Sequence, residues 1–176
     1  MYPILRLSKE MIRASRMPKL PPGGVHETHH LCWPIDLDFQ MEMNNGRVLT
    51  IFDLGRIPLA VRVNLFQATR KMKWGFAMAG ASVRYRRRIV AFDRLRMTSR
   101  ALARDERFFY MEQTLWRRDE AVASILCRAA TTSRAGIVPT DEVADVMGYT
   151  DWRPEAPDWV TAWIAADVQR PWPPQS

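Results

Sequence analysis

The sequence GRVLTIFDLGRIPLAVRVNLF, residues 46–66, predicts a helix that is buried on most of its sides. Apolar and small residues recur through it at spacings of three and four, the periodicity of one helix face: Val48, Phe52, Gly55, Leu59 and Val63. Other apolar residues lie between these positions, so the apolar surface is much wider than a single stripe. Pro58 lacks a backbone N–H group, and we therefore expect two helical pieces or one bent helix.

Four strand-like runs follow this helix. In each run apolar and polar residues alternate, which is the pattern of an antiparallel strand with one buried face. The expected buried faces are Ala81, Val83 and Tyr85; Leu95, Met97, Ser99 and Ala101; Phe109, Met111 and Leu115; and Ala123, Ile125, Cys127 and Ala129. A helix that is apolar nearly all round needs a sheet curled about it, so this order predicts an α+β fold.

The rest of the chain is predicted to frame this unit. Residues 1–24 are basic and mildly amphipathic and form an N-terminal arm, which ends at Pro-Pro-Gly-Gly. The main domain covers residues 25–148, and it begins with a strand over 25–33 and a loop over 35–45. A short helix over 140–147 ends at Gly148.

Residues 149–176 are rich in Trp and Pro and form a C-terminal extension, with a helix over 158–168. Its aromatic residues are Trp152, Trp159, Trp163 and Trp172. We expect them to pack on the domain or on a partner subunit. An alternative is that the extension and the basic arm lie on an anionic membrane surface.

Composition and charge restrict the class of protein. The chain has 176 residues and a net charge of +7, carried mostly by Arg, whose planar fork suits phosphate oxygens. Nucleic acid, an anionic membrane or a small phosphorylated ligand would fit this charge. No apolar run is long enough to span a bilayer, and the basic residues do not precede an apolar run as in a secretory leader.

Cysteine and histidine usage gives no sign of a disulfide or a metal site. Cys32 and Cys127 both lie in apolar, strand-like stretches, which favours reduced core thiols and a cytoplasmic protein. His26, His29 and His30 have no carboxylate or Cys at ligand spacing, so we expect no metal.

The loop before the central helix carries the most specific pattern in the sequence. It reads WPIDLDFQMEMNNGRVL over residues 33–49, with an Asp-x-Asp pair followed by Asn-Asn-Gly at the helix start. Two further motifs accompany this loop: FDLGR over 52–56, and Tyr-Arg-Arg over 85–87 followed by Phe-Asp over 92–93. Taken together, the three motifs resemble the 4-hydroxybenzoyl-CoA thioesterase-like branch of the hotdog-fold thioesterases. The resemblance covers residues 25–135.

This resemblance implies a hotdog fold, an antiparallel sheet of five or six strands wrapped around a long central helix, over residues 25–148. Subunits of such proteins pair so that two sheets join, with active sites at the dimer interface. In relatives, the second Asp of the loop attacks the thioester carbonyl or activates a water molecule, and this position is Asp38 here. Amides at the start of the central helix, near Asn45 and Gly46, would hold the developing oxyanion.

Other residues around this loop are candidate substrate contacts. CoA carries a pyrophosphate and a ribose phosphate, to which guanidinium groups are well matched. The candidates are Arg84, Arg86, Arg87 and Arg88, with Asn44 as a further contact. The alternatives are a solvated strand face for the Arg run and a helix N-cap for Asn44.

Glu42 departs from the pattern of the family. Many relatives have His at this position, and an ionised carboxylate cannot donate the hydrogen bond that His can. Glu42 is therefore a second general base in the active site or a surface residue. Asp36 is expected to bond local backbone or face solvent, and Asp53 and Arg56 are expected to form an ion pair along the helix.

The sequence therefore predicts a thioester hydrolase acting on acyl-CoA, a homodimer or tetramer, with no cofactor other than the coenzyme A of its substrate. The alternative is a non-catalytic hotdog protein that binds acyl-CoA or an acyl lipid. Nucleic-acid binding is not expected, because it rests on net charge alone. The acyl-chain preference, and the choice between nucleophile and general base for Asp38, stay open.

Overall fold

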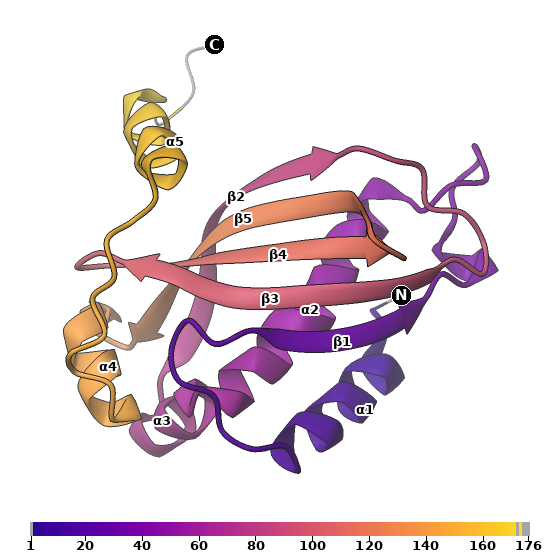
Figure 1. Ribbon diagram of the computed structural model, residues 1–176. Coiled ribbons are helices and arrows are strands. Elements are labelled where there is room, and N and C mark those ends of the chain that lie inside the picture. The colour runs from indigo at the N-terminus through magenta and orange to yellow at the C-terminus, as the bar shows by residue number, and fades with distance from the viewer. Residues whose placement is uncertain (1, 172, 174–176) are drawn as a thin grey trace.

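The computed structural model describes residues 2–171 and 173. Its six-stranded antiparallel sheet has the order β1-β3-β4-β5-β2, with β6 paired to β5. The strands are β1 His26–Leu31, β2 Gly75–Tyr85, β3 Arg94–Arg104, β4 Phe109–Arg117, β5 Glu120–Ser133 and β6 Gly136–Ile137. The helices are α1 Ile4–Ser15, η1 Pro34–Asp36, α2 Asn45–Arg62, α3 Leu65–Met72, α4 Thr140–Met147 and α5 Asp158–Gln169. The sheet curls over α2, which confirms the predicted α+β fold (Figure 1).

Helix α2 is buried around most of its circumference, as its apolar sequence predicted. Its buried residues are Val48, Ile51, Phe52, Leu54, Gly55, Pro58, Leu59, Val61 and Arg62. The sheet packs on one side and α1 on another. Gly55 lies where the helix comes closest to the sheet, because a Cβ atom there would be 2.6 Å from Met97 Cε and 3.0 Å from Gln113 Nε2.

The break in this helical segment lies later than Pro58. The predicted interruption at Pro58 is wrong in position, because α2 continues through Pro58 to Arg62. Packing on both sides holds this segment helical although Pro58 cannot donate to the preceding turn. The chain leaves the helix at Asn64, whose φ of 63° is left-handed, and α3 begins at Leu65. Asn is one of the few non-glycine residues that adopt this conformation readily.

The alternating pattern predicted the buried faces of β3, β4 and β5 well but that of β2 poorly. Tyr85, Val83 and Ala81 do share the concave face, opposite Ala123, Ile125 and Cys127 of β5. However, β2 is an edge strand, and Tyr85 remains 46% exposed. Alternation shows which residues share a face, whereas burial depends on what covers that face in three dimensions.

Both terminal segments pack on the domain. The expected N-terminal arm contains α1, which buries Glu10 and Ala14 against the rest of the protein and packs on α2. The expected C-terminal extension contains α5, whose Val160 is buried with Tyr110 and Leu126 on the convex face of the sheet. Trp172, within the predicted aromatic extension, lies outside the described residues.

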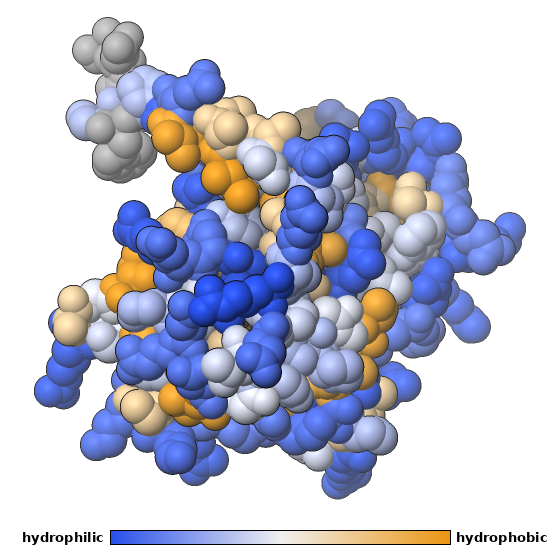
Figure 2. All heavy atoms as spheres, turned by 60° about the vertical axis from the view of Figure 1, so that its left-hand side comes forward, coloured by the Kyte–Doolittle hydropathy of each residue, from blue (hydrophilic) through white to orange (hydrophobic). Residues whose placement is uncertain are grey.

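Helix α5 is attached mainly at one side. Arg128 Nη2 donates to Asp167 Oδ2 at 2.6 Å, and its guanidinium stacks on Phe108 and Trp163. The opposite side is open, and Val168 is 76% exposed. Apolar side chains of α5 are visible beside the grey C-terminal atoms in Figure 2.

The two cysteines are free and buried, as predicted. Burial raises the pKa of each thiol to about 11, so both stay protonated at neutral pH and are poor nucleophiles. Among the described helices, none combines the length and the apolar character needed to cross a bilayer.

Two histidines lie on the buried face of β1. His26 Nδ1 accepts from Arg62 Nη1 at 3.3 Å, so its proton is on Nε2, which is buried without a partner. His30 Nε2 lies 2.8 Å from Thr28 Oγ1. Burial and nearby cations lower the pKa of His26 to about 4 and that of His30 to about 3.

These histidines make stability depend on pH. The unfolded chain takes up protons on them below a pKa of about 6.5, whereas the folded protein does not until about pH 4 for His26 and pH 3 for His30. Stability is therefore lost as the pH falls below about 6.5, by roughly 1–2 kcal/mol for each histidine between pH 7 and pH 5.

Urea unfolding at pH 7 and pH 5 measures this loss. The matched variant is His26→Asn/His30→Gln, whose amides occupy the positions of the hydrogen-bonding ring nitrogens. We expect the variant to lose much less stability than the native protein over this range. An equal loss in the two proteins would show that other groups cause the pH dependence.

Candidate active site

The loop between β1 and α2 is fixed by the buried carboxylate of Asp36. Asp36 is 2% exposed, and its oxygens lie 2.9 Å from Arg6 Nη1 of α1 and 3.1 Å from Arg47 Nε of α2. The carboxylate also accepts from the backbone N–H of Trp33 at 3.0 Å. Asp36 thus joins two helices and the loop, including the local backbone contact that its sequence position suggested.

Asp38 lies two residues further on, in a tight turn. Its Oδ1 accepts from the backbone N–H of Gln40 at 2.8 Å, and its own N–H donates to the Glu42 carbonyl at 2.8 Å. Met41 supports the turn with a left-handed φ of 60°. No protein group within the described residues donates to Asp38 Oδ2. One carboxylate oxygen is therefore held and the other is available.

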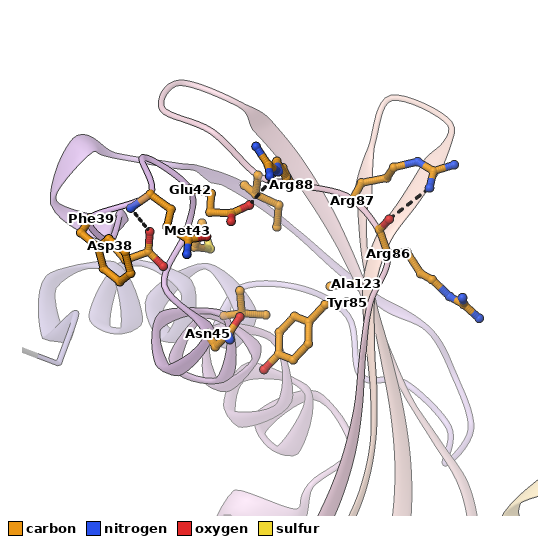
Figure 3. A pocket seen from close by; sticks show the side chains of 13 residues that line it. Asp38, Phe39, Glu42, Met43, Asn45, Tyr85, Arg86, Arg87, Arg88 and Ala123 are labelled. Atoms are coloured by element: carbon orange, nitrogen blue, oxygen red, sulfur yellow. Dashed lines mark hydrogen bonds and ion pairs between the residues drawn. The ribbon is translucent and has the colours of Figure 1, made fainter.

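The Asp38 carboxylate borders a pocket of 480 Å³. One side of the pocket is the loop and the start of α2, and the other side is the end of β2 and the segment after it (Figure 3). The lining residues are Asp38, Phe39, Gln40, Glu42, Met43, Asn45, Val48, Tyr85, Arg86, Arg87, Arg88, Ile89 and Ala123.

The structure brings together only part of the set predicted from the sequence. Asp38, Glu42, Asn45 and the three arginines over 86–88 all border this pocket. Asn44 and Gly46 border a different hollow, with Tyr2 and Ile35. Arg84 lies beside Trp159 and Trp163 of α5, at a third hollow. Because side chains alternate along β2, Arg84 projects from the opposite face to Tyr85.

The amides at the start of α2 are not equally available. Asn44 is the N-cap, and its Oδ1 accepts from the N–H of Gly46 at 2.9 Å and of Arg47 at 3.3 Å. The Gly46 amide is therefore engaged in the cap. The N–H of Asn45 has no acceptor in the described part of the protein, and it stands at the positive end of the helix dipole.

The charged rim of the pocket consists of Arg residues that differ in their partners. Arg88 Nε lies 3.4 Å from Glu42 Oε2, and Arg87 Nε lies 2.5 Å from Glu120 Oε1. Arg86 has no carboxylate partner among residues 2–171 and 173. Figure 3 shows the Arg86 and Arg87 side chains directed away from the pocket and that of Arg88 directed toward Glu42.

Tyr85 was not predicted as a site residue. Its ring points from β2 toward Asn45 across the pocket (Figure 3). Burial raises the pKa of its hydroxyl, so the phenol is protonated and can donate a hydrogen bond at neutral pH. The strand pattern placed Tyr85 on the concave face, but only the fold shows that this face meets the start of α2.

A second feature that the sequence did not reveal is an apolar cavity of 300 Å³. It lies between α2 and α3 on one side and β2, β4 and β5 on the other. Its lining is Asp53, Arg56, Ile57, Ala60, Leu65, Phe66, Phe76, Ala77, Met78, Phe109, Met111, Ala129, Ala130 and Thr131. The predicted ion pair between Asp53 and Arg56 is confirmed and supplies the charged part of this lining.

The chain matches the model of the thioesterase-like superfamily over residues 32–164. Protein THEM6 of Xenopus laevis is 32% identical over 143 residues, which cover 79% of this chain and 67% of that protein.

Two solved structures have a similar fold. The probable thioesterase YbaW from Escherichia coli has a TM-score of 0.65 at 19% identity, covering 70% of this chain and 97% of that chain. Slr0204, a 1,4-dihydroxy-2-naphthoyl-CoA thioesterase from Synechocystis, has a TM-score of 0.62 at 11% identity, covering 73% of this chain and 98% of that chain. These similarities confirm the predicted hotdog fold.

Proposed function

The chain belongs to the thioesterase-like superfamily, and from this we propose that it hydrolyses an acyl-CoA to the free acid and CoA. The observation that carries the proposal is the Asp38 carboxylate at the pocket. One of its oxygens is fixed by Gln40 N–H at 2.8 Å, and the start of α2 borders the same pocket. A held carboxylate can serve as the base or nucleophile of acyl transfer, and a helix N-terminus can supply donors to the oxyanion.

Asp38 can act in either of two ways. As a general base, it takes a proton from water while the water oxygen attacks the thioester carbonyl. The C–S bond then breaks, and the departing thiolate recovers the proton. As a nucleophile, Asp38 itself attacks and forms an anhydride as CoA leaves, and water then hydrolyses the anhydride.

The developing oxyanion would be stabilised from both sides of the pocket. The Asn45 N–H has no acceptor among the described residues, and the helix dipole adds positive potential there. The Tyr85 phenol, which is protonated at neutral pH, faces Asn45 and is the second donor that we propose. The Gly46 amide is the weaker candidate, because it already donates to Asn44 Oδ1 at 2.9 Å.

The CoA phosphates would bind at the arginine rim. Arg88 is the first candidate, because its side chain is directed toward the pocket and its contact with Glu42 is 3.4 Å long. Arg86 has no carboxylate partner in the described structure but is directed away from the pocket, so it would contact a phosphate outside the pocket. Glu42 would then orient Arg88 rather than act as a base. Arg84 and Asn44, which lie at other hollows, are less suitable for this role.

The acyl group would occupy the apolar cavity beside α2. One stripe of α2 leads from the Asp38 pocket to this cavity. Along it lie Asn45, Leu49, Asp53 and Arg56, at helical spacings of three and four. The concave face of β2 along this path is open, with Met78 45% exposed. We propose that a second copy pairs with the free edge of β2 and closes the path, which gives a homodimer or a tetramer.

Release of free CoA thiol from short, long and aromatic acyl-CoAs tests the activity. We expect turnover with apolar acyl groups that fill the cavity, and much less with acetyl-CoA. The same preparation should sediment as a dimer or tetramer. Turnover by a monomer would contradict the proposal that a second copy closes the path to the cavity. Absence of both acyl-CoA binding and turnover would contradict the proposed function.

Two observations favour a second candidate, a hotdog protein that binds acyl-CoA or an acyl lipid without hydrolysing it. The Gly46 N–H donates to the Asn44 side chain, so only the Asn45 N–H, of the two helix amides expected to hold the oxyanion, has no acceptor among the described residues. In addition, Glu42 stands where many relatives have His. Saturable binding of acyl-CoA without release of thiol in the same assay would identify this function.

A further inference from the structure

Helix α1 has an apolar stripe on the side that faces solvent. Its inner side buries Glu10 and Ala14, while Leu5 is 87% and Ile12 is 54% exposed. These two residues lie seven apart and therefore on one face of the helix. Ile4 adds a third exposed aliphatic side chain at the helix start. Isolated exposed aliphatic residues are common, but a stripe of them along one helix suggests a contact.

The same outer side is basic. Arg13 and Arg16 are exposed, and neither has a carboxylate partner in the part of the chain described by the structure, whereas Lys19, which follows the helix, donates inward to the Val61 carbonyl of α2 at 2.9 Å. Lys9 is exposed too, and it lies 3.0 Å from Glu10, the one acid of α1, which is 1% exposed. The outer side therefore presents cations and no accessible carboxylate of its own.

The apolar surface extends beyond the helix. Tyr2 and Ile35 border one hollow of 420 Å³, and Ile35 is 78% exposed. The nearest carboxylates do not offset the basic charge: Asp36 is ion-paired to Arg6 and Asp53 to Arg56. The patch formed by Tyr2, Ile4, Leu5, Ile12 and Ile35 is thus flanked by unneutralised cations.

We propose that this patch binds an anionic phospholipid surface. The helix would lie flat, with its aliphatic residues at the level of the headgroups and its cations against the lipid phosphates. Its twelve residues extend over about 18 Å, enough for several lipids. A second copy of the chain is a poorer occupant, because two such faces would bring like charges together.

Co-sedimentation with vesicles tests this surface without any acyl-CoA, so it is independent of the proposed activity. We expect the full chain to bind vesicles of phosphatidylcholine and phosphatidylglycerol in low salt. It should not bind vesicles of phosphatidylcholine alone, and salt should release it. Arg13→Gln/Arg16→Gln should weaken binding roughly 25-fold, about fivefold for each charge. Leu5→Ser/Ile12→Ser should weaken it about tenfold or more, because aliphatic burial is lost.

Matched controls remove the same chemistry from elements other than α1. Arg70→Gln/Arg134→Gln removes two exposed cations, and Val168→Ser removes an aliphatic residue that is 76% exposed. Both controls should bind like the native chain. Equal binding to neutral vesicles, or equal losses in the controls and the α1 variants, would overturn the proposal. So would self-association that disappears in Leu5→Ser/Ile12→Ser without any binding of vesicles.

Discussion

Replacement of Asp38 by Asn is expected to lower the rate of CoA release by about 10²- to 10⁴-fold, the contribution of a positioned general base. Asn keeps the side-chain oxygen that accepts from Gln40 N–H at 2.8 Å, so the turn should persist. What Asn lacks is the negative charge and the basicity needed to attack the thioester or activate water. Initial rates with the best acyl-CoA of the panel measure the loss.

The control for Asp38→Asn is Asp119→Asn, in the exposed turn between β4 and β5, which should leave the rate unchanged. Circular dichroism and thermal unfolding should not distinguish Asp38→Asn from the native protein. Normal turnover by Asp38→Asn would show that Asp38 has only its structural role in the turn.

A single turnover in water labelled with heavy oxygen tests whether Asp38 is the nucleophile. Attack by Asp38 followed by hydrolysis of the anhydride at the Asp38 carbonyl would leave label in the Asp38 carboxylate. Activation of water would place all of the label in the released acid, as would hydrolysis of the anhydride at its acyl carbonyl, so label in Asp38 is the decisive result. The geometry accommodates both routes, since only one carboxylate oxygen is held by the turn.

The elements that the sequence predicted well are those determined by local pattern. The breadth of the apolar surface of α2 predicted a helix enclosed on most sides, and the alternation in β3, β4 and β5 predicted their buried faces. The helix over 140–147 and the one near 158–168 follow from local end signals, and both are present. The loop motif indicated the fold before any contact was known.

The features that the sequence predicted poorly depend on contacts between distant segments. Alternation cannot show that β2 lies at the sheet edge, which leaves Tyr85 exposed. Pro58 favours a break, but packing on both sides of α2 outweighs it, and Asn64 ends the helix region.

The site was predicted only in part for the same reason. Arg84 and Arg86 are close neighbours in the basic run, yet they border different hollows. The Gly46 amide was expected to face the substrate, but the Asn44 side chain occupies it. The apolar cavity involves three strands and two helices, so no short motif could have indicated it.

Replacement of Asp36 by Asn is expected to destabilise the fold strongly. Asp36 is 2% exposed, and its carboxylate lies 2.9 Å from Arg6 and 3.1 Å from Arg47. Removing one member of a buried ion pair typically costs about 3–5 kcal/mol, because the remaining charge stays desolvated. Arg6 is 23% exposed at its side chain, so solvent offsets part of this cost, and we expect about 3 kcal/mol.

Thermal unfolding should show this loss as a decrease in Tm of roughly 6–12 °C for a chain of this size. Arg6→Gln alone should cost less, because Arg47 still contacts the carboxylate at 3.1 Å. The loss of stability in the double variant Asp36→Asn/Arg6→Gln should be smaller than the sum of the losses in the two single variants, because the desolvated Arg6 charge is also removed. Strict additivity would show that the pair does not hold α1 to the loop.

The two aspartates of the loop should therefore separate structure from chemistry. Asp38→Asn should lose turnover at nearly native stability, because its turn is kept while its charge is lost. Asp36→Asn should lose stability and retain much of its turnover well below its Tm, because Asp36 does not border the pocket that Asp38 lines. The reverse pattern, with turnover abolished in Asp36→Asn and preserved in Asp38→Asn, would transfer the catalytic role to the first aspartate of the pair.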